Sequence, residues 1–309
     1  MKSSNIGGQA VLEGIMMKNG SKYAVAVRKP DGEIDVKVEE YASAIKWKKL
    51  TKIPFIRGVF NFVDSLLLGM KTLTYSASFW EEEETENVEL TAEELKKKEK
   101  KDNIIMTITM IASVIIAMGI FMVLPYFISS LFSSIVESHL LRTVIEAVVR
   151  ISLFVIYILL ISRMKDIQRV FMYHGAEHKC INCIEHGLEL NVENVRKSSK
   201  QHKRCGTSFL FFVVIVSVIV CFFITVKSPL LRVAIRIALI PFIAGISYEI
   251  IRLAGNSNNP IINLLSTPGL AMQNLTTKEP EDDMIEVAIK AVEEVFDWRA
   301  YLEENFEEK

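Results

Sequence analysis

The residues best suited to chemistry lie in the polar segment 173–180, which contains His174, Glu177 and His178. Imidazole and carboxylate groups hold transition metals and transfer protons near neutral pH. If this segment is helical, the two histidines lie one turn apart, which is the spacing that lets both rings bind one ion. We therefore predict a metal site. The alternative is that both histidines bond to backbone groups or to lipid headgroups.

The order His-x-x-Glu-His in this segment is similar to the inverted zincin motif, in which the carboxylate activates water at the metal. Glu177 is accordingly the predicted general base. Glu185 falls on the same helical face as His174 and His178 and is a second candidate base or an extra ligand.

A third ligand is needed, and Cys205 is the candidate. It stands at the start of an apolar run, beside Lys203 and Arg204. Positive neighbours at a helix N-terminus favour the thiolate. Two imidazoles and one thiolate form a plausible zinc set, so we expect Zn²⁺ or another divalent transition metal at His174, His178 and Cys205.

The remaining cysteines are weaker candidates. Cys180 and Cys183 would point away from the two histidines on a helix, and a single Cys-x-x-Cys pair is weak evidence for zinc. We expect them to pack in the interior.

The elements that must position these residues are predominantly apolar helices. Half of the 309 residues are hydrophobic, and residues 104–132 and 209–226 carry no charge. Such runs are typical of membrane-spanning helices. The sequence predicts a mainly α, polytopic helical membrane protein with about four spans. The expected spans are residues 104–127, 143–162, 209–226 and 231–253.

Positive charge predicts the orientation. Residues 163–204 hold nine Lys or Arg residues, whereas the two short loops between spans hold Arg142 and Lys227. The positive-inside rule then places both termini and the loop 163–207 in the cytoplasm, and the protein in the cytoplasmic membrane as a multi-pass protein. The bilayer is the expected partner, and a homo-oligomer is possible. Nucleic acid is not expected, because no basic tract interleaved with aromatics occurs.

The N-terminal region, residues 1–50, is predicted to be cytoplasmic. Segments 23–28 and 34–38 alternate in the manner of strands around a Pro-Asp-Gly turn, which predicts a β-hairpin. Before it, Gln9 and Glu13 lie in a glycine-rich segment, where they are either inward-pointing polar groups or parts of a turn.

The other regions follow from composition. Residues 51–80 predict an amphipathic helix, interfacial or re-entrant, and residues 81–103 a charged linker in which a helix begins. The membrane domain is residues 104–253, and residues 254–309 form a cytoplasmic tail that ends in an amphipathic helix. Ionisable groups inside the spans should face the bundle interior or lie near the span ends. These are Glu146, Arg150, Arg236 and Glu249.

Several separated motifs together resemble one family. They are residues 7–17 (GGQAVLEGIMM), 174–179 (HGAEHK), 204–209 (RCGTSF) and 247–249 (SYE). They closely resemble the YqhQ-like bacterial membrane family, whose members are described as predicted metal-dependent enzymes. The resemblance implies a membrane location and a metal, and it supplies no reaction. It directs attention to the polar residues within the motifs, which are Gln9, Glu13, His174, Glu177, His178, Cys205 and Glu249.

Three functions remain open at this point. The first is a zinc-dependent membrane enzyme, hydrolytic in type, acting on an unidentified substrate at the cytoplasmic face. The second is a transporter or channel subunit that uses the intramembrane charges. The third is a membrane scaffold in which a structural metal only fixes the loop.

Overall fold

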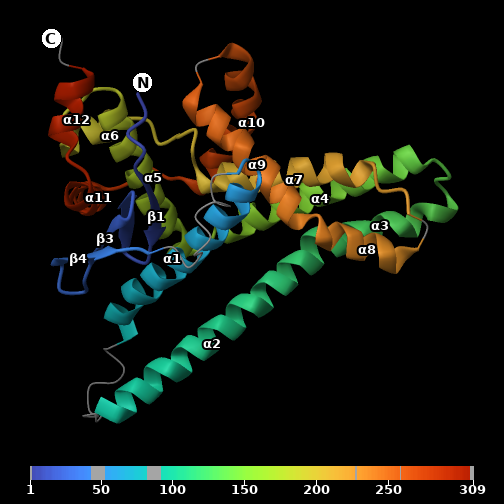
Figure 1. Cartoon of the computed structure of the whole chain (residues 1–309), viewed down its shortest axis with the longest axis horizontal. Helices are drawn as coiled ribbons and strands as arrows, with labels where there is room; N and C mark the ends of the chain where they lie inside the picture. Colours follow the sequence, from blue (N-terminus) through green and yellow to red (C-terminus); the bar gives the residue numbers. More distant parts are fainter. Residues whose placement is uncertain (1, 43–52, 82–91, 227, 258, 307–309) are drawn as a thin grey trace. The chain divides into compact units, whose positions relative to one another are not determined.

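The computed structural model describes residues 2–42, 53–81, 92–226, 228–257 and 259–306. Its elements are shown in Figure 1. The chain divides into two compact units. One comprises Met1–Glu81, Ile158–Val213 and Pro241–Lys309, and the other comprises Glu82–Tyr157 and Val214–Ile240. Residues 82–91 of the predicted charged linker lie outside the described residues, which resume in α2 (Ala92–Met118).

A four-stranded antiparallel sheet begins the first unit, in the order β1-β2-β3-β4. The predicted hairpin corresponds to β3 (Lys22–Arg28) and β4 (Ile34–Glu40). The glycine-rich segment before it adds β1 (Gly7–Val11) and β2 (Gly14–Asn19), so the sheet is larger than predicted. The turn between these two strands places Glu13 at φ 48°, a conformation that usually signals Gly or Asn. A glutamate there gives no turn signal.

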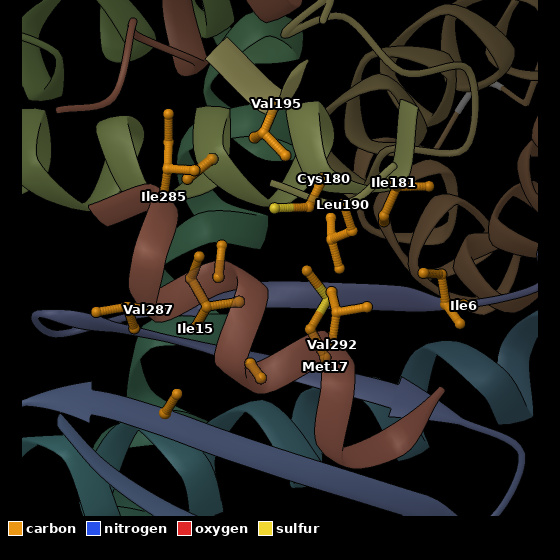
Figure 2. Packing of buried hydrophobic residues seen from close by; sticks show 14 of the residues in the cluster. Ile6, Ile15, Met17, Cys180, Ile181, Leu190, Val195, Ile285, Val287 and Val292 are labelled. Atoms are coloured by element: carbon orange, nitrogen blue, oxygen red, sulfur yellow. The ribbon is translucent and has the colours of Figure 1, made fainter. Parts of the chain in front are cut away.

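Helices pack on this sheet and form the main core. They are α5 (Lys165–Glu185), α6 (Val192–Lys197), α11 (Asp282–Val295) and α12 (Trp298–Asn305). Helix α11 contacts β2, β3 and α5. Figure 2 shows Met17 of the sheet beside Val292 of α11 and Ile15 beside Val287, with Cys180 of α5 in the same cluster. The amphipathic helix predicted near the C-terminus is this α11.

Helix α1 (Ile56–Glu81) directs its polar stripe toward protein. The Asn61 side chain donates to Tyr248 Oη over 2.7 Å, and Lys71 pairs with Glu39 of β4. Apolar residues such as Leu66 and Leu73 are exposed instead. Exposed apolar residues on one face of a helix are typical of a surface that contacts lipid or another protein.

The number of predicted spans is only partly supported. Among the described residues, two helical stretches are long and apolar enough to cross a membrane: 100–134, which includes the end of α2, and 140–161, which lies within α4 (His139–Ile161). A third span requires α8 (Pro229–Ala238) and α9 (Ile240–Asn256) to count together. The remaining candidate, α7 (Gly206–Phe222), has 17 residues and is short for a span.

The first long stretch is not one regular helix. After α2 it continues as a π-helical turn, η3 (Gly119–Val123), then α3 (Leu124–Leu131), and closes in the 3₁₀ turn η4 (Phe132–Ser134). Pro125 lies in the first turn of α3 and has no N–H to donate to the carbonyl of Phe121, which accepts from Arg150 Nε instead.

The second unit buries the predicted intramembrane charges together. Glu146 and Arg150 of α4 lie with Arg236 of α8, each no more than 5% exposed. Glu249 belongs to the first unit instead, where it pairs with Arg57 of α1. Helix α10 (Pro260–Thr276) was not predicted; it begins at the end of the segment 255–260, with the Asn259 side chain as its N-cap.

Candidate metal centre

The three predicted ligands lie together. His174 and His178 share one face of α5, with ring centroids 4.4 Å apart. Cys205 directly precedes α7, and its Sγ lies 3.2 Å from His174 Nε2. One nitrogen from each histidine and this sulfur lie within 4.8 Å of one another. A single ion with three protein ligands fits such a cluster.

Both imidazoles are held through the nitrogen that faces away from the cluster. His174 Nδ1 lies 2.9 Å from the carbonyl oxygen of Thr276, and His178 Nδ1 lies 2.7 Å from that of Lys200. A carbonyl only accepts, so each Nδ1 carries the proton and donates it. In the neutral ring, Nε2 then presents a free lone pair. Metal-ligating histidines are typically oriented by such a bond.

Gly175 allows the segment whose Thr276 carbonyl holds His174 to pack closely against α5. A Cβ on Gly175 would overlap the carbonyl oxygen of Lys278, so the glycine lets the segment after α10 lie directly on α5. The Lys278 amide donates to the Phe171 carbonyl over 2.9 Å and fixes that contact. Glycine destabilises a helix by up to about 1 kcal/mol relative to alanine, but at this position it allows the close approach.

Glu177 lies beside the ligand cluster and is 6% exposed. Its Oε1 accepts a hydrogen bond of 3.1 Å from the Gly8 amide, and its Oε2 lies 4.0 Å from His174 Nε2. A Cβ on Gly8 would meet the Glu177 side chain at 2.9 Å, so glycine permits this contact as well. One carboxylate oxygen is thus anchored, and the other faces the histidines.

A small cavity of about 90 Å³ opens at the cluster. It is lined by His174, Glu177, His178, His202 and Cys205, among others. A water needs only about 30 Å³ and two to four polar partners, so the cavity has room for water next to the ligands.

The electrostatics favour a thiolate. Burial alone would raise the pKa of Cys205, but His174 and His178 outweigh it and lower that pKa well below its usual value. Burial likewise opposes charge on His174, yet the neighbouring Cys205 raises the pKa of this imidazole. Thiolate and imidazole therefore stabilise each other. A thiolate is the form of cysteine that binds a metal.

Comparison with known proteins supports the family resemblance. A family described as "Protein of unknown function (DUF1385)" matches residues 53–298. The chain is also 36% identical over 300 residues to "Uncharacterized protein YqhQ" of Bacillus subtilis (strain 168), covering 97% of this chain and 94% of that protein. The chain belongs to the DUF1385 family. No solved structure matches it. The matched range includes all three ligands, His174, His178 and Cys205.

Glu185 of this DUF1385 chain lies apart from the three ligands. Its Oε1 accepts from the Ser4 amide at 2.8 Å and from the Arg204 guanidinium. Burial alone would raise its pKa, but His202, Arg204 and the Ser4 amide lower it to about 2. The carboxylate ties the N-terminal segment to the loop before α7.

The other predicted positions are also held by partners outside the cluster. Gln9 donates from Nε2 to the Ser65 carbonyl over 3.2 Å. Glu13 pairs with Arg169 and accepts from Tyr173 Oη over 3.3 Å. Glu249 pairs with Arg57 of α1 and accepts from the Phe55 amide over 3.2 Å. These contacts connect elements of the first unit.

Sequence reasoning did not single out His202, although it borders the cavity. Its ring lies 5.6 Å from that of His178, and it is 4% exposed. His202 Nε2 has no hydrogen-bond partner among the described residues and lies 3.6 Å from Glu185 Oε2. Its position three residues before Cys205 was the available signal.

Proposed function

We propose that this protein is a zinc-dependent membrane enzyme of hydrolytic type. The observation that carries the proposal is the pair of imidazoles whose Nδ1 atoms donate to carbonyl oxygens of Thr276 and Lys200, which leaves two Nε2 atoms facing one thiolate. An ion bound between these nitrogens and the Cys205 sulfur would account for the close approach of the three atoms.

The donor set fits zinc. Two neutral nitrogens and a thiolate are ligands for borderline-soft ions, whereas magnesium and calcium prefer oxygen. Three protein ligands with an adjacent cavity are typical of catalytic zinc, which keeps one position open. When bound there, zinc supplies Lewis-acid chemistry and makes water acidic enough to attack near neutral pH.

Each remaining residue has a definable task. His174, His178 and Cys205 hold the ion. The Gly8 amide fixes one oxygen of Glu177, so that the other oxygen stays directed toward the cluster. A carboxylate in that position accepts a proton from water and returns it to the leaving group.

A location at the cytoplasmic membrane is part of the proposal. Its support is the apolar stretch 100–134, helix α4 and the exposed apolar residues of α1. The Lys and Arg residues of 163–204 favour a cytoplasmic position for the site and for both termini.

The test compares hydrolysis by wild type, Glu177→Gln and Glu189→Gln against ester, amide and phosphodiester substrates, with zinc content measured in parallel. Glutamine can keep the bond from Gly8, so we expect Glu177→Gln to retain zinc and lose about 10²–10⁴-fold in rate. Glu189 is exposed and serves as the matched control. Equal rates in Glu177→Gln and wild type would contradict the role of this carboxylate.

A structural metal is the second candidate, and the burial of the ligands favours it. His178 is 1% and Cys205 4% exposed, as in closed structural sites. In that case all three proteins would bind zinc, none would turn over any substrate, and removing the metal would unfold the wild type.

A further inference from the structure

A second polar cavity lies within the other unit, far along the chain from the metal ligands. Its volume is about 240 Å³, and its walls come from α3, α4, α7 and α8. The polar lining includes Tyr126, Ser129, Arg142, Glu146, Arg232 and Arg236. Three arginines and one glutamate leave this lining with an excess of two positive charges.

The single carboxylate is already shared. Glu146 Oε1 accepts from Arg150 Nη2 over 2.7 Å, and Glu146 Oε2 accepts from Arg236 Nη2 over 2.9 Å. Two buried guanidinium groups therefore share one negative charge. An uncompensated buried charge costs several kcal/mol, so the cluster calls for a further anion.

The hydrogen bonds show which guanidinium nitrogens lack an acceptor among the described residues. Arg150 is satisfied, because Nε donates to the Phe121 carbonyl over 3.0 Å and Nη1 to Ser217 Oγ over 3.2 Å. Arg236, which is 3% exposed, has a buried Nε without an acceptor among the described residues. Arg142 Nε, in α4, is likewise buried and has no acceptor among the residues that the structure describes.

Exposed apolar residues neighbour the lining residues in the sequence. Leu131, Ile135 and Leu230, from the same ends of the helices, are about 77–82% exposed. Exposed aliphatic side chains together with a basic cavity match the boundary between acyl chains and headgroups in a membrane. The centroid of the Tyr126 ring lies 5.3 Å from the Arg232 guanidinium and 5.1 Å from that of Arg236, so the ring contacts both cations.

We propose that this cavity binds a phosphate group, with Arg142 and Arg236 as its ligands. Arg232, whose Nε and Nη2 donate to the Val226 carbonyl, adds a further positive charge to the lining. Guanidinium groups recognise phosphate through paired N–H donors, and the unpaired Nε atoms of Arg142 and Arg236 supply such donors. The volume is below the range of about 300–1,000 Å³ for drug-sized ligands, so the group that enters is small. The phosphate comes from a lipid headgroup or from free phosphate, and the exposed apolar residues favour the lipid.

Native mass spectrometry in a neutral, phosphate-free detergent tests this site. The probes are phosphatidylglycerol, a diacylglycerol with the same acyl chains, and inorganic phosphate. We expect one phosphatidylglycerol per chain to bind saturably, and the diacylglycerol to bind at least about tenfold more weakly because it lacks the charge-assisted bonds.

Three variants connect binding to the arginines. Arg142→Gln and Arg232→Gln should each weaken phosphatidylglycerol binding about tenfold, whereas Arg163→Gln, at an exposed arginine elsewhere, should leave it unchanged. Two cavity variants are used so that a folding defect in one, seen as a lowered unfolding midpoint, leaves the other informative. If inorganic phosphate binds and Arg142→Gln weakens that binding, while phosphatidylglycerol does not bind, the site is assigned to the free anion. The proposal is overturned if wild type and both cavity variants bind phosphatidylglycerol equally well, and bind inorganic phosphate equally well.

Discussion

The imidazole of His174 donates a hydrogen bond of 2.9 Å to the carbonyl oxygen of Thr276, a residue 102 positions later in the chain. This bond joins the C-terminal end of α10 to the metal-ligand face of α5. It fixes the ring orientation and the tautomer at once, because a carbonyl accepts only from a protonated nitrogen. The arrangement of the predicted metal ligands therefore depends on the docking of the segment 276–280.

Gly175→Ala tests that docking. The new Cβ would overlap the Lys278 carbonyl oxygen, so the segment must move away from α5 and carry Thr276 with it. We expect a destabilisation of about 1–3 kcal/mol despite alanine's higher helix propensity. Zinc affinity should fall about 10–100-fold because the outer bond to His174 is disturbed.

Thermal unfolding and zinc titration in detergent provide the measurements. Gly119→Ala is the matched control, since a Cβ at Gly119 meets nothing within 4 Å. The account of Gly175 fails if its alanine variant is as stable as wild type and binds zinc equally well.

The contact between Glu39 and Lys71 gives a prediction about pH. The pKa of Glu39 is lowered from an ordinary value of 4.5 to about 2. The main cause is the hydrogen bond from Lys71, and hydrogen bonds from Tyr23 and Lys37 add to it. A carboxyl whose pKa is lower in the folded state stabilises the fold above its unfolded pKa. That stabilisation is lost as the pH falls from about 4.5 toward about 2.

Unfolding midpoints of wild type and Glu39→Gln should therefore differ at pH 6 and approach each other as the pH falls toward about 2. The difference should stay below about 1 kcal/mol, since Lys71 is largely exposed. Glu40→Gln, at the exposed next position of β4, is the control. A difference between wild type and Glu39→Gln that grows toward pH 3 would refute this assignment.

Glu146→Gln should be strongly destabilising. It removes the carboxylate that Arg150 and Arg236 share, and leaves two buried guanidinium groups without a counter-charge. We expect a loss of about 3–5 kcal/mol, read from unfolding in detergent. Glu137→Gln, at an exposed position, should change stability by less than about 0.5 kcal/mol. A mild effect at Glu146 would mean that the arginines are neutralised by another group.

The sequence predicted those parts of the site that depend on local geometry. His174 and His178 are one helical turn apart, so a helix alone brings their rings together. Cys205 was predictable because it begins an apolar helix next to positive residues. The contributions of Gly8, Thr276 and Lys200 were not predictable. Each supplies a backbone N–H or carbonyl group that tertiary packing brings to the site, and a residue's type does not indicate such a contact.

Glu185 shows the limit of a helical-face argument. It shares the face of His174, but eleven residues along a helix correspond to about 16 Å. Its carboxylate instead accepts from Ser4 and Arg204. The strands β1 and β2 were missed for a different reason, since Glu13 occupies a left-handed position where turn rules expect glycine or asparagine.

Metal analysis of detergent-purified protein tests the central claim most directly. We expect roughly one zinc per chain in wild type, in His186→Gln and in Cys221→Ser, because neither His186 nor Cys221 belongs to the cluster. The double variant His174→Gln/His178→Gln should lose the metal, and cobalt-substituted Cys205→Ser should lose the thiolate-to-metal absorption in the near ultraviolet. Zinc retained in full by the double histidine variant, or a thiolate band unchanged in Cys205→Ser, would contradict the account.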